Sequence, residues 1–477
     1  MSEVPESGAL LVLRSTAWQW AFKAVTLALG FVSISLVTRL LGPGDYGRVG
    51  VATTYVGFVV ALSDLGLPTI VARDVARAPD ALRGHVTTAT WGRALLFVPT
   101  YALALAVAVP LYRHDPVVLG AIAIGLLMLL PSAVTSTLAA VLQVQARLHV
   151  AAALELGARA VTVAATVAVL RNGGGVRGVV VVMVAVTALH CAVVVRLLAR
   201  HLGGWSAWDG GSFRRLVRAA LPLGVAVVLN SLYFRMDTIV LSLLRPAADV
   251  GVYVAAYRVM ELMLVFPSLF AAAALPLLSR AATGGDRLMP LVAKCLRLVV
   301  TILLPLTVVV AVDARRILVL LGGSAFAPGE AAMRVLAFAA LVSGLNIVLG
   351  LAIVALDRQG RALWLNVGAL TLNVVLNLAL DRRGGPPVAA ALTLGCEALV
   401  VVGASLVVRR ATGSLPSVPY LGRLLVCAAA AAGVLALLPG GLGVVPRGLA
   451  VGVAYAGLLL MTRAVTVEDV RLLRAAA

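Results

Sequence analysis

Six basic side chains lie inside long apolar segments of this sequence, where ionisable groups are rare. They are Lys23, Arg93, Arg159, Arg235, Arg258 and Arg334. The carboxylates in or beside such segments are Asp64, Glu155, Asp237, Glu261 and Glu397. In hydrocarbon a charged side chain is costly, so it normally faces a charged partner, a water-filled cavity or a ligand. Because basic residues outnumber acids here, the pattern favours the binding of an anion.

Helical spacing identifies the charges that can pair within one helix. Glu155 and Arg159 are four residues apart, with the acid first, and Arg258 and Glu261 are three apart. Side chains at these spacings lie on one face of a helix. We therefore expect both pairs to form structural ion pairs.

The other charges in the apolar segments lack such a neighbour. Arg235 and Asp237 are two residues apart and point in different directions on a helix, so each needs another partner, water or a ligand. Within their own segments Lys23, Arg93 and Arg334 have no carboxylate at either spacing. These basic residues are therefore the better candidates for an anion site.

Polar residues also recur on single faces of three apolar segments. The three sets are Gln19, Lys23, Thr26, Gly30 and Ser33; Ser231, Arg235, Thr238 and Ser242; and Asn366, Asn373 and Asn377. One polar face on each helix is what the lining of a water-filled cavity needs. Alternatively, Lys23 extends along its stem to the membrane surface. The asparagines either form interhelical hydrogen bonds or contact sugar hydroxyls.

The composition identifies the class of protein that holds these charges. Apolar residues make up 62% of the 477-residue chain, charged residues 12%, and the mean hydropathy is +1.05. Soluble domains have about 45–50% apolar and about 25% charged residues. The composition therefore excludes a water-soluble enzyme and predicts an all-α integral membrane protein.

The apolar segments are long enough for about fourteen membrane-spanning helices, since each span needs about 20 residues. The predicted spans are 15–38, 49–70, 86–110, 117–142, 150–170, 178–198, 219–243, 250–274, 292–312, 331–356, 362–380, 388–408, 421–439 and 448–463. The net charge of +19 resides mostly in short loops between these spans, so topology explains it better than nucleic-acid binding does.

Loop charges and loop lengths predict the orientation and the domains. If both termini are cytoplasmic, the inner segments carry about twice as many basic residues as the outer ones. The longest polar stretch, 199–218, divides the first twelve spans into halves. The predicted domains are a six-helix bundle at 1–200, a cytoplasmic linker at 201–218, a second six-helix bundle at 219–410, and helices 13 and 14 with a cytoplasmic tail at 411–477.

The two halves share a motif after their first spans. One copy begins at Leu40 and ends at Gly47, and the other begins at Leu243 and ends at Gly251. Each contains a double leucine, a proline, an acidic residue and then a glycine at the start of the next span. This spacing predicts parallel repeats, which place a substrate site between two bundles. Proline and glycine also mark a simple tight turn.

These residues resemble the polysaccharide-biosynthesis, or O-antigen-type, flippases of the multidrug/oligosaccharidyl-lipid/polysaccharide exporter superfamily. The matching segments are 41–47, 62–67, 235–241, 250–258 and the asparagines Asn366, Asn373 and Asn377. The resemblance covers residues 12–465. It implies two six-helix bundles around a central cavity, with two further helices. It also implies that a polyprenyl-pyrophosphate-linked oligosaccharide moves from the inner to the outer leaflet of the cytoplasmic membrane by alternating access.

A flippase of this kind needs fixed cations, because a diphosphate cannot enter hydrocarbon unpaired. A guanidinium fork suits phosphate geometry. The predicted pyrophosphate ligands are Lys23, Arg93, Arg235, Arg258 and Arg334, with Gln19, Asn366, Asn373 and Asn377 as sugar or interhelical contacts. Asp64, Asp237 and Glu397 are candidate carriers of a coupling proton or sodium ion.

Other functions compete with this one. A peptidoglycan-precursor flippase would carry a similar diphosphate lipid, a multidrug exporter of the same superfamily would bind cations, and a membrane polymerase or glycosyltransferase would be an enzyme. We expect no enzyme activity, cofactor, metal or nucleic-acid partner. The four cysteines are widely spaced, and the sequence has no nucleotide-binding loop. The expected partners are the lipid-linked saccharide, membrane lipid, and the polymerase and glycosyltransferases of the same pathway.

Overall fold

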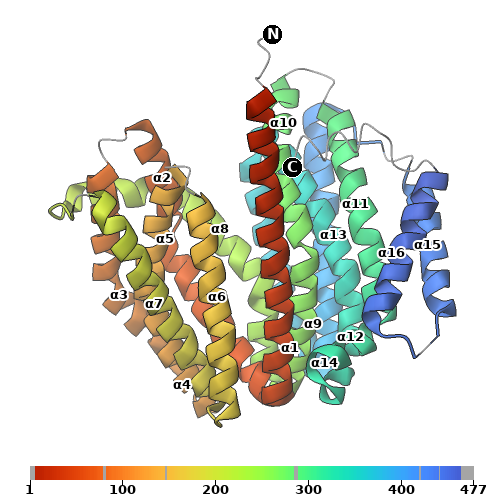
Figure 1. Cartoon of the computed structure of the whole chain (residues 1–477), viewed down its shortest axis with the longest axis horizontal. Helices are drawn as coiled ribbons and strands as arrows, with labels where there is room; N and C mark the ends of the chain where they lie inside the picture. Colours follow the sequence, from red (N-terminus) through yellow and green to blue (C-terminus); the bar gives the residue numbers. More distant parts are fainter. Residues whose placement is uncertain are drawn as a thin grey trace. The chain divides into compact units, whose positions relative to one another are not determined.

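The computed structural model describes residues 6–78, 82–144, 148–202, 204–283, 288–417, 420–439 and 441–462. Side chains are described from residue 28 onward, except those of residues 140–149, 199–203 and 272. Every regular element in these ranges is a helix, as Figure 1 shows. The prediction of an all-α chain is confirmed.

The first helices follow the apolar segments of the sequence. They are α1 (Glu6–Asp64), α2 (Leu67–Arg77), α3 (Leu82–Tyr112), α4 (Pro116–Gly125), η2 (Leu126–Met128), α5 (Leu129–Val144), α6 (Leu148–Arg171), α7 (Gly175–Leu202) and α8 (Gly210–Leu244). Asp209 caps α8 by accepting from the Gly211 amide at 2.9 Å. The Ser212 hydroxyl also donates to Asp209, and this bond is the main cause of its lowered pKa.

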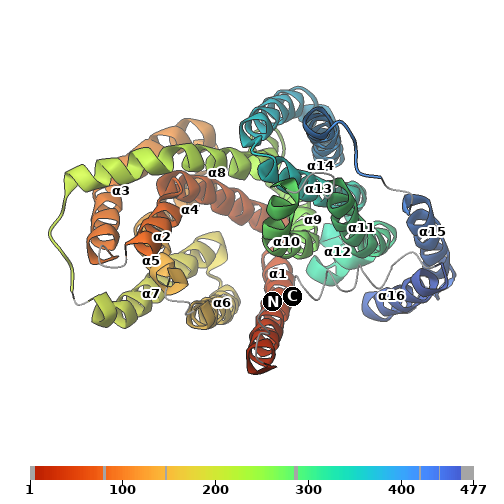
Figure 2. The ribbon, with the colours of Figure 1, turned by 90° about the horizontal axis from the view of Figure 1, so that it is seen from above.

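The remaining helices complete the chain. They are α9 (Ala247–Met263), α10 (Val265–Thr283), α11 (Leu288–Val312), α12 (Ala314–Gly322), η3 (Ser324–Gly329), α13 (Glu330–Ala355), α14 (Gln359–Thr412), α15 (Leu421–Leu437) and α16 (Val444–Met461). Helices α15 and α16 lie side by side in both Figure 1 and Figure 2. Between α7 and α8 the described non-helical residues are 204–209, fewer than in the predicted linker at 201–218.

Within the described residues, eleven helical segments are long and apolar enough to cross a membrane. Two helices, α1 and α14, each contain a kink at a glycine with positive φ followed by proline: Gly42 (φ 70°) and Gly385 (φ 58°). Each kink falls between two predicted spans. The helix breaks there because proline removes a backbone donor and cannot continue a regular helix. The chain is a multi-pass membrane protein. The count of fourteen spans and the cytoplasmic placement of both termini stay predictions.

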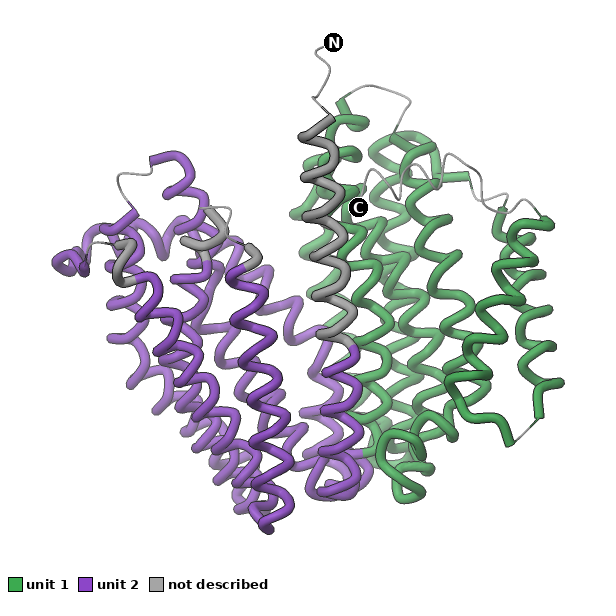
Figure 3. Tube along the Cα trace, in the orientation of Figure 1, with its two compact units in different colours: residues 1–17, 252–477 green, residues 18–251 purple. Residues whose placement is uncertain are grey.

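The helices form two compact units (Figure 3). Unit 2 contains residues 18–251, and unit 1 contains residues 252–477 together with 1–17. The first six predicted spans and α8 therefore share unit 2. The predicted domain boundaries at 200, 218 and 410 stay a prediction.

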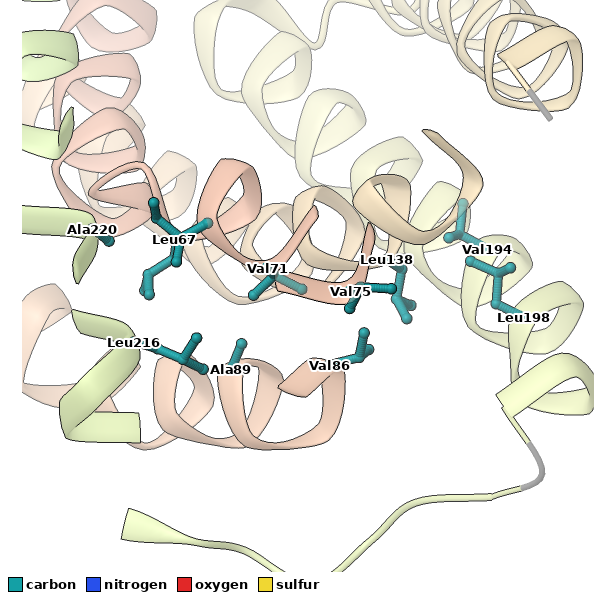
Figure 4. Packing of buried hydrophobic residues seen from close by; sticks show 11 residues of the cluster. Leu67, Val71, Val75, Val86, Ala89, Leu138, Val194, Leu198, Leu216 and Ala220 are labelled. Carbon is teal, nitrogen blue, oxygen red and sulfur yellow. The ribbon is translucent and has the colours of Figure 1, made fainter. Parts of the chain in front are cut away.

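The short helix α2 organises one end of unit 2. Its apolar residues Leu67, Ile70, Val71 and Val75 recur at helical spacing, so they form one buried face. Figure 4 shows Leu67, Val71 and Val75 directed into a cluster with side chains from α3, α5, α7 and α8. The partners in that cluster are Val86, Ala89, Leu138, Val194, Leu198, Leu216 and Ala220. This packing holds the beginning of α8 against α2 and α3.

The two copies of the repeated motif contact each other in unit 2. A Cβ atom on Gly47 would collide with the Ala247 carbonyl, and one on Gly251 would collide with the Pro43 carbonyl. Pro43 and Ala247 each lie four residues before the glycine of their own copy. The contact is therefore reciprocal, as a two-fold relation between repeats requires. Only glycine permits this approach of the two backbones.

This close approach makes a prediction for Gly251→Ala. The new methyl group would overlap a backbone carbonyl, which cannot move aside as a side chain can. We therefore expect the free energy of unfolding to fall by about 1–3 kcal/mol. The measurement is thermal unfolding of the purified protein in detergent. Gly44→Ala is the matched control, since its Cβ meets no atom within 4 Å. Equal melting temperatures for the two variants would contradict the contact.

Buried charge fastens the α15–α16 pair within unit 1. Arg447 of α16 donates to Asp313 Oδ2 at 2.9 Å, and both side chains are at most 4% exposed. The same guanidinium donates to the carbonyls of Leu435 and Leu438 at 2.9 and 3.0 Å. Arg316 approaches the other carboxylate oxygen of Asp313 at 2.5 Å. Arg447 thereby neutralises a buried acid and satisfies the end of α15.

We predict that Arg447→Leu lowers the free energy of unfolding by about 3–5 kcal/mol, because Asp313 and the carbonyls of Leu435, Leu438 and Pro439 lose a partner. Arg316 still faces Asp313, so the loss should fall near the lower value. Adding Asp313→Asn should restore part of the stability by removing the buried charge. Arg423→Leu, on the exposed side of α15, is the control. Thermal unfolding of the wild type, Arg447→Leu, the double variant and Arg423→Leu tests the prediction. An equal loss of stability in Arg423→Leu and Arg447→Leu would contradict it.

Candidate functional site

The predicted site residues are divided between the two units. Asp64, Arg93, Arg235 and Asp237 belong to unit 2, and those from Arg258 onward belong to unit 1. The side chains of Gln19 and Lys23 lie outside the described residues, so their predicted roles stay predictions.

Arg93 is the most enclosed of the predicted anion ligands whose side chains the structure describes. It lies on α3, is 3% exposed, and forms an ion pair with Asp64 at the end of α1. Its Nη1 also donates to the Ala133 carbonyl at 2.9 Å, Ser136 Oγ at 2.9 Å and Thr137 Oγ1 at 3.0 Å. The prediction that Arg93 has no carboxylate three or four residues away on its own helix is correct. The tertiary structure supplies Asp64 from another one.

The backbone around Asp64 explains how the acid reaches Arg93. Helix α1 ends there, and the next two residues, Leu65 and Gly66, have φ of 43° and 71°. The left-handed turn changes the chain direction before α2 begins. A Cβ on Gly224 of α8 would collide with the Leu65 carbonyl, so α8 packs directly on this turn. Asp64 is thus fixed between α3 and α8 and is not on a free helix end.

Arg235 and Asp237 lie on α8, as predicted, and face different surroundings. Asp237 is 2% exposed, whereas Arg235 is half-buried. A Cβ atom on Gly57 of α1 would lie 3.9 Å from Arg235 Nη1. The Arg235 guanidinium is therefore next to Gly57, at van der Waals distance from the position of a Cβ.

Both predicted helical ion pairs are present. Arg258 Nη1 is 2.6 Å from Glu261 Oε2, with the two side chains about one-third exposed. Arg159 Nη2 is 3.4 Å from Glu155 Oε1, and this pair is mostly exposed. The prediction that Arg334 has no acidic neighbour is wrong: its Nη2 is 2.5 Å from Glu330 Oε1. Helix α13 begins at Glu330, one residue before the predicted span, which places the acid four positions earlier.

A column of polar side chains lies on one face of α14. Asn373, Asn377 and Asp381 recur every four residues and are at most 2% exposed. The Asn377 amide donates to the Asn373 carbonyl at 2.8 Å, a bond within the helix. Asn366 is half-buried on the same helix. Asp381 was missed because it lies just beyond the predicted end of the span, although its spacing from Asn377 was a readable signal.

Glu397 lies on the second part of α14 and is paired with α13. The Asn346 amide donates to the Glu397 carboxylate and, at 3.0 Å, to its backbone carbonyl. Asn346 Oδ1 is buried and accepts no hydrogen bond. The Glu397 residue is 2% exposed, so its carboxyl is a buried acid in a polar setting. Such a group can exchange a cation or a proton when its surroundings change. No pattern of spacing or composition singles out Asn346 in the sequence.

The structure thus contains membrane-spanning helices with buried acids and half-buried arginines. Within the part of the chain that it describes, no three acidic, histidine or cysteine side chains are grouped as metal ligands. This arrangement is typical of a transporter that holds charged groups within the bilayer.

Comparison of folds defines the class. A structure described as "Lipid II flippase MurJ, inward closed conformation" matches with a TM-score of 0.73 at 13% identity, covering 93% of this chain and 99% of that one. An inward-facing MATE-family multidrug resistance transporter matches with a TM-score of 0.63 at 14% identity, covering 82% and 95%. A transporter from Pyrococcus furiosus matches with a TM-score of 0.54 at 11% identity, covering 82% and 92%. Identities this low show the fold alone.

The chain has the transporter fold of the multidrug/oligosaccharidyl-lipid/polysaccharide exporter superfamily. The family described as "Polysaccharide biosynthesis protein" matches residues 12–282, more than half of the chain. The MatE family matches residues 222–379. The chain belongs to the polysaccharide biosynthesis protein family. Among curated protein sequences none matches it.

The enclosure of Arg93 predicts a structural effect on substitution. Arg93→Leu leaves Asp64 without its guanidinium partner. We therefore expect the free energy of unfolding to fall by about 3–5 kcal/mol. Arg93→Leu combined with Asp64→Leu should be more stable than Arg93→Leu alone, because removing both partners avoids an unpaired charge. Thermal unfolding of these variants measures the coupling between the two side chains.

Arg159→Leu is the control for this experiment, since its ion pair with Glu155 is exposed and should contribute at most about 0.5 kcal/mol. If the losses of stability in Arg93→Leu and Asp64→Leu simply added up in the double variant, the two side chains would not be coupled.

Proposed function

We propose that this protein moves a polyprenyl-pyrophosphate-linked oligosaccharide from the inner to the outer leaflet of the cytoplasmic membrane, for cell-surface polysaccharide biosynthesis. The single observation that carries the proposal is the family match over residues 12–282. The composition and fold support a transporter, and the families that match are transporters, not enzymes. The proposal adds the substrate and the direction of movement.

The charges of the spans support an anionic headgroup. Arg235 and Arg258 are half-buried on α8 and α9, so each is accessible to a ligand yet shielded from bulk water. A guanidinium in such surroundings binds phosphate more strongly than an exposed one, because the effective dielectric is lower. We propose Arg235, Lys23 and Arg258 as phosphate ligands, with the phosphate replacing Glu261 as the partner of Arg258. Arg93 has Asp64 and three other acceptors, and Arg334 is exposed with Glu330, so both are weaker candidates.

The energy for transport would come from an ion gradient or from removal of the product outside. Asp64, Asp237 and Glu397 are the proposed carriers of a proton or sodium ion. Glu397, which accepts from Asn346, and Asp381 in the polar column of α14 are both buried acids whose charge must be compensated. The polymerase and glycosyltransferases of the same pathway are the proposed protein partners.

A peptidoglycan-precursor flippase is the second candidate. The structure described as a Lipid II flippase is matched over 99% of its own length, and its named substrate is also a lipid-linked saccharide. Charge does not distinguish these two lipids, because both carry a diphosphate. A multidrug exporter is a third candidate, favoured by the MatE match, but organic cations would meet an excess of basic side chains.

A flip assay with purified protein in liposomes tests the substrate. A short-chain polyprenyl-pyrophosphate oligosaccharide is supplied, and a membrane-impermeant probe measures its appearance in the outer leaflet. We expect Arg235→Ala and Lys23→Ala to reduce the flip rate by at least about tenfold, since each removes a charge that replaces water around the diphosphate. Both proteins should still be folded and inserted.

Arg159→Ala is the matched control, because its ion pair with Glu155 is exposed and lies outside the proposed site. Its flip rate should equal that of the wild type. Background rates for folded wild-type protein would contradict the proposed substrate, and the same assay with a peptidoglycan lipid precursor would follow. Wild-type flip rates for both Arg235→Ala and Lys23→Ala would contradict the proposed roles of these residues but not the proposed substrate.

A further inference from the structure

Unit 2 also contains a cavity of about 210 Å³. Its walls come from α1, α4, η2, α5 and α7. Its lining includes Val56, Gly57, Gly125, Ser132, Val180 and Met183. Several lining residues, including Gly57 and Met183, are half-buried, so the cavity is accessible from outside the unit.

Small residues on facing helices create this cavity. A Cβ atom on Gly125 would lie 2.8 Å from a methyl carbon of Val56 and 3.4 Å from one of Val180. Gly125 therefore lets three helices approach closely at one level. Gly57 directly follows Val56 on α1, and the nearest atom to its missing Cβ is Arg235 Nη1 at 3.9 Å. A Cβ at Gly57 would therefore meet the Arg235 guanidinium at ordinary van der Waals distance.

The walls offer little to water. The lining is apolar except for the hydroxyls of Thr53 and Ser132. Thr53 Oγ1 already donates to the Val49 carbonyl at 2.8 Å. In another protein, an engineered apolar cavity of about 150 Å³ stays dry and binds benzene. The larger cavity of unit 2 therefore suits a hydrocarbon group, with room for about seven water-sized groups at roughly 30 Å³ each.

A cation marks one side of the same cavity. Gly57 lines the cavity, and Arg235 Nη1 is 3.9 Å from the position of its missing Cβ. A guanidinium thus lies at the boundary of a hydrocarbon-sized space. A ligand that fills both combines an anionic group with an apolar chain, as a phosphate joined to an isoprenoid does.

We propose that this cavity binds the isoprenoid unit next to the diphosphate of the lipid carrier, while Arg235 binds the phosphate. The inference rests on the proposed function and adds a tail subsite to it. The volume fits about one branched five-carbon unit, so the rest of the polyprenyl chain stays in the bilayer. The subsite would hold the first carbons of the tail in register with the headgroup and select prenyl over other lipid phosphates.

Binding of two soluble probes to the full-length protein in detergent tests this. Geranyl diphosphate carries both the phosphates and two isoprenoid units, whereas inorganic pyrophosphate carries only the charge. Ala52→Leu, at a lining residue of α1, fills the cavity from one side, and Ser132→Leu fills it from α5. Isothermal titration calorimetry measures both affinities, and thermal unfolding checks that each variant is folded.

We expect each filling variant to weaken geranyl diphosphate binding by about tenfold or more, because the apolar contacts are lost, and to leave pyrophosphate binding unchanged. Gly433→Leu is the control, since Gly433 lies on α15 with no atom within 4 Å of its Cβ position. This variant should bind both probes as the wild type does.

The other outcomes separate the two proposals. If both filling variants bind geranyl diphosphate as tightly as the wild type, or lose the two probes equally, the tail subsite is overturned and the proposed function stands. If folded wild-type protein binds neither probe, the proposed function is overturned together with the subsite.

Discussion

The cost of placing a polar or charged group in hydrocarbon governs the architecture of this protein. Each regular element in the described residues is a helix, because only a helix or a closed barrel satisfies the backbone within a bilayer. The same cost explains the side chains. Asp313 is 1% exposed and is neutralised by Arg447, while Arg93 is enclosed by Asp64 and hydroxyl groups. We propose a functional role for the half-buried charge of Arg235.

Buried charge and close backbone contact together hold the helices in register. Hydrophobic burial does not drive helices together when lipid is equally apolar, so small residues and polar links become the main sources of specificity. The reciprocal contact of Gly47 and Gly251 joins the two copies of the repeated motif. In unit 1, Arg447 fastens the α15–α16 pair by bonding at once to an acid and to the end of a helix. Each of these contacts is specific to one register.

The candidate site uses the same combination of small residues and fixed charges. Gly57 lines the apolar cavity and lies beside the Arg235 guanidinium, so a proposed phosphate-binding group is close to a hydrocarbon-sized space. A lipid-linked diphosphate has the same two parts. For the buried acids Asp381 and Glu397, on α14 in unit 1, we propose a different task, the compensation of a moving cation.

Local composition and spacing along single helices were enough to predict the membrane class, the apolar helical segments, the breaks between spans near Gly42 and Gly385, and two ion pairs within helices. Short motifs in a fixed order identified the family. Three-dimensional packing was needed to show that Asp64 pairs with Arg93, that Asn346 meets Glu397, and that Gly47 meets Gly251. These contacts join segments far apart in the chain, and periodicity within one helix carries no information about which other helix packs against it. The pairing of Arg334 with Glu330 depended on where a helix begins, which hydropathy locates only to within a few residues.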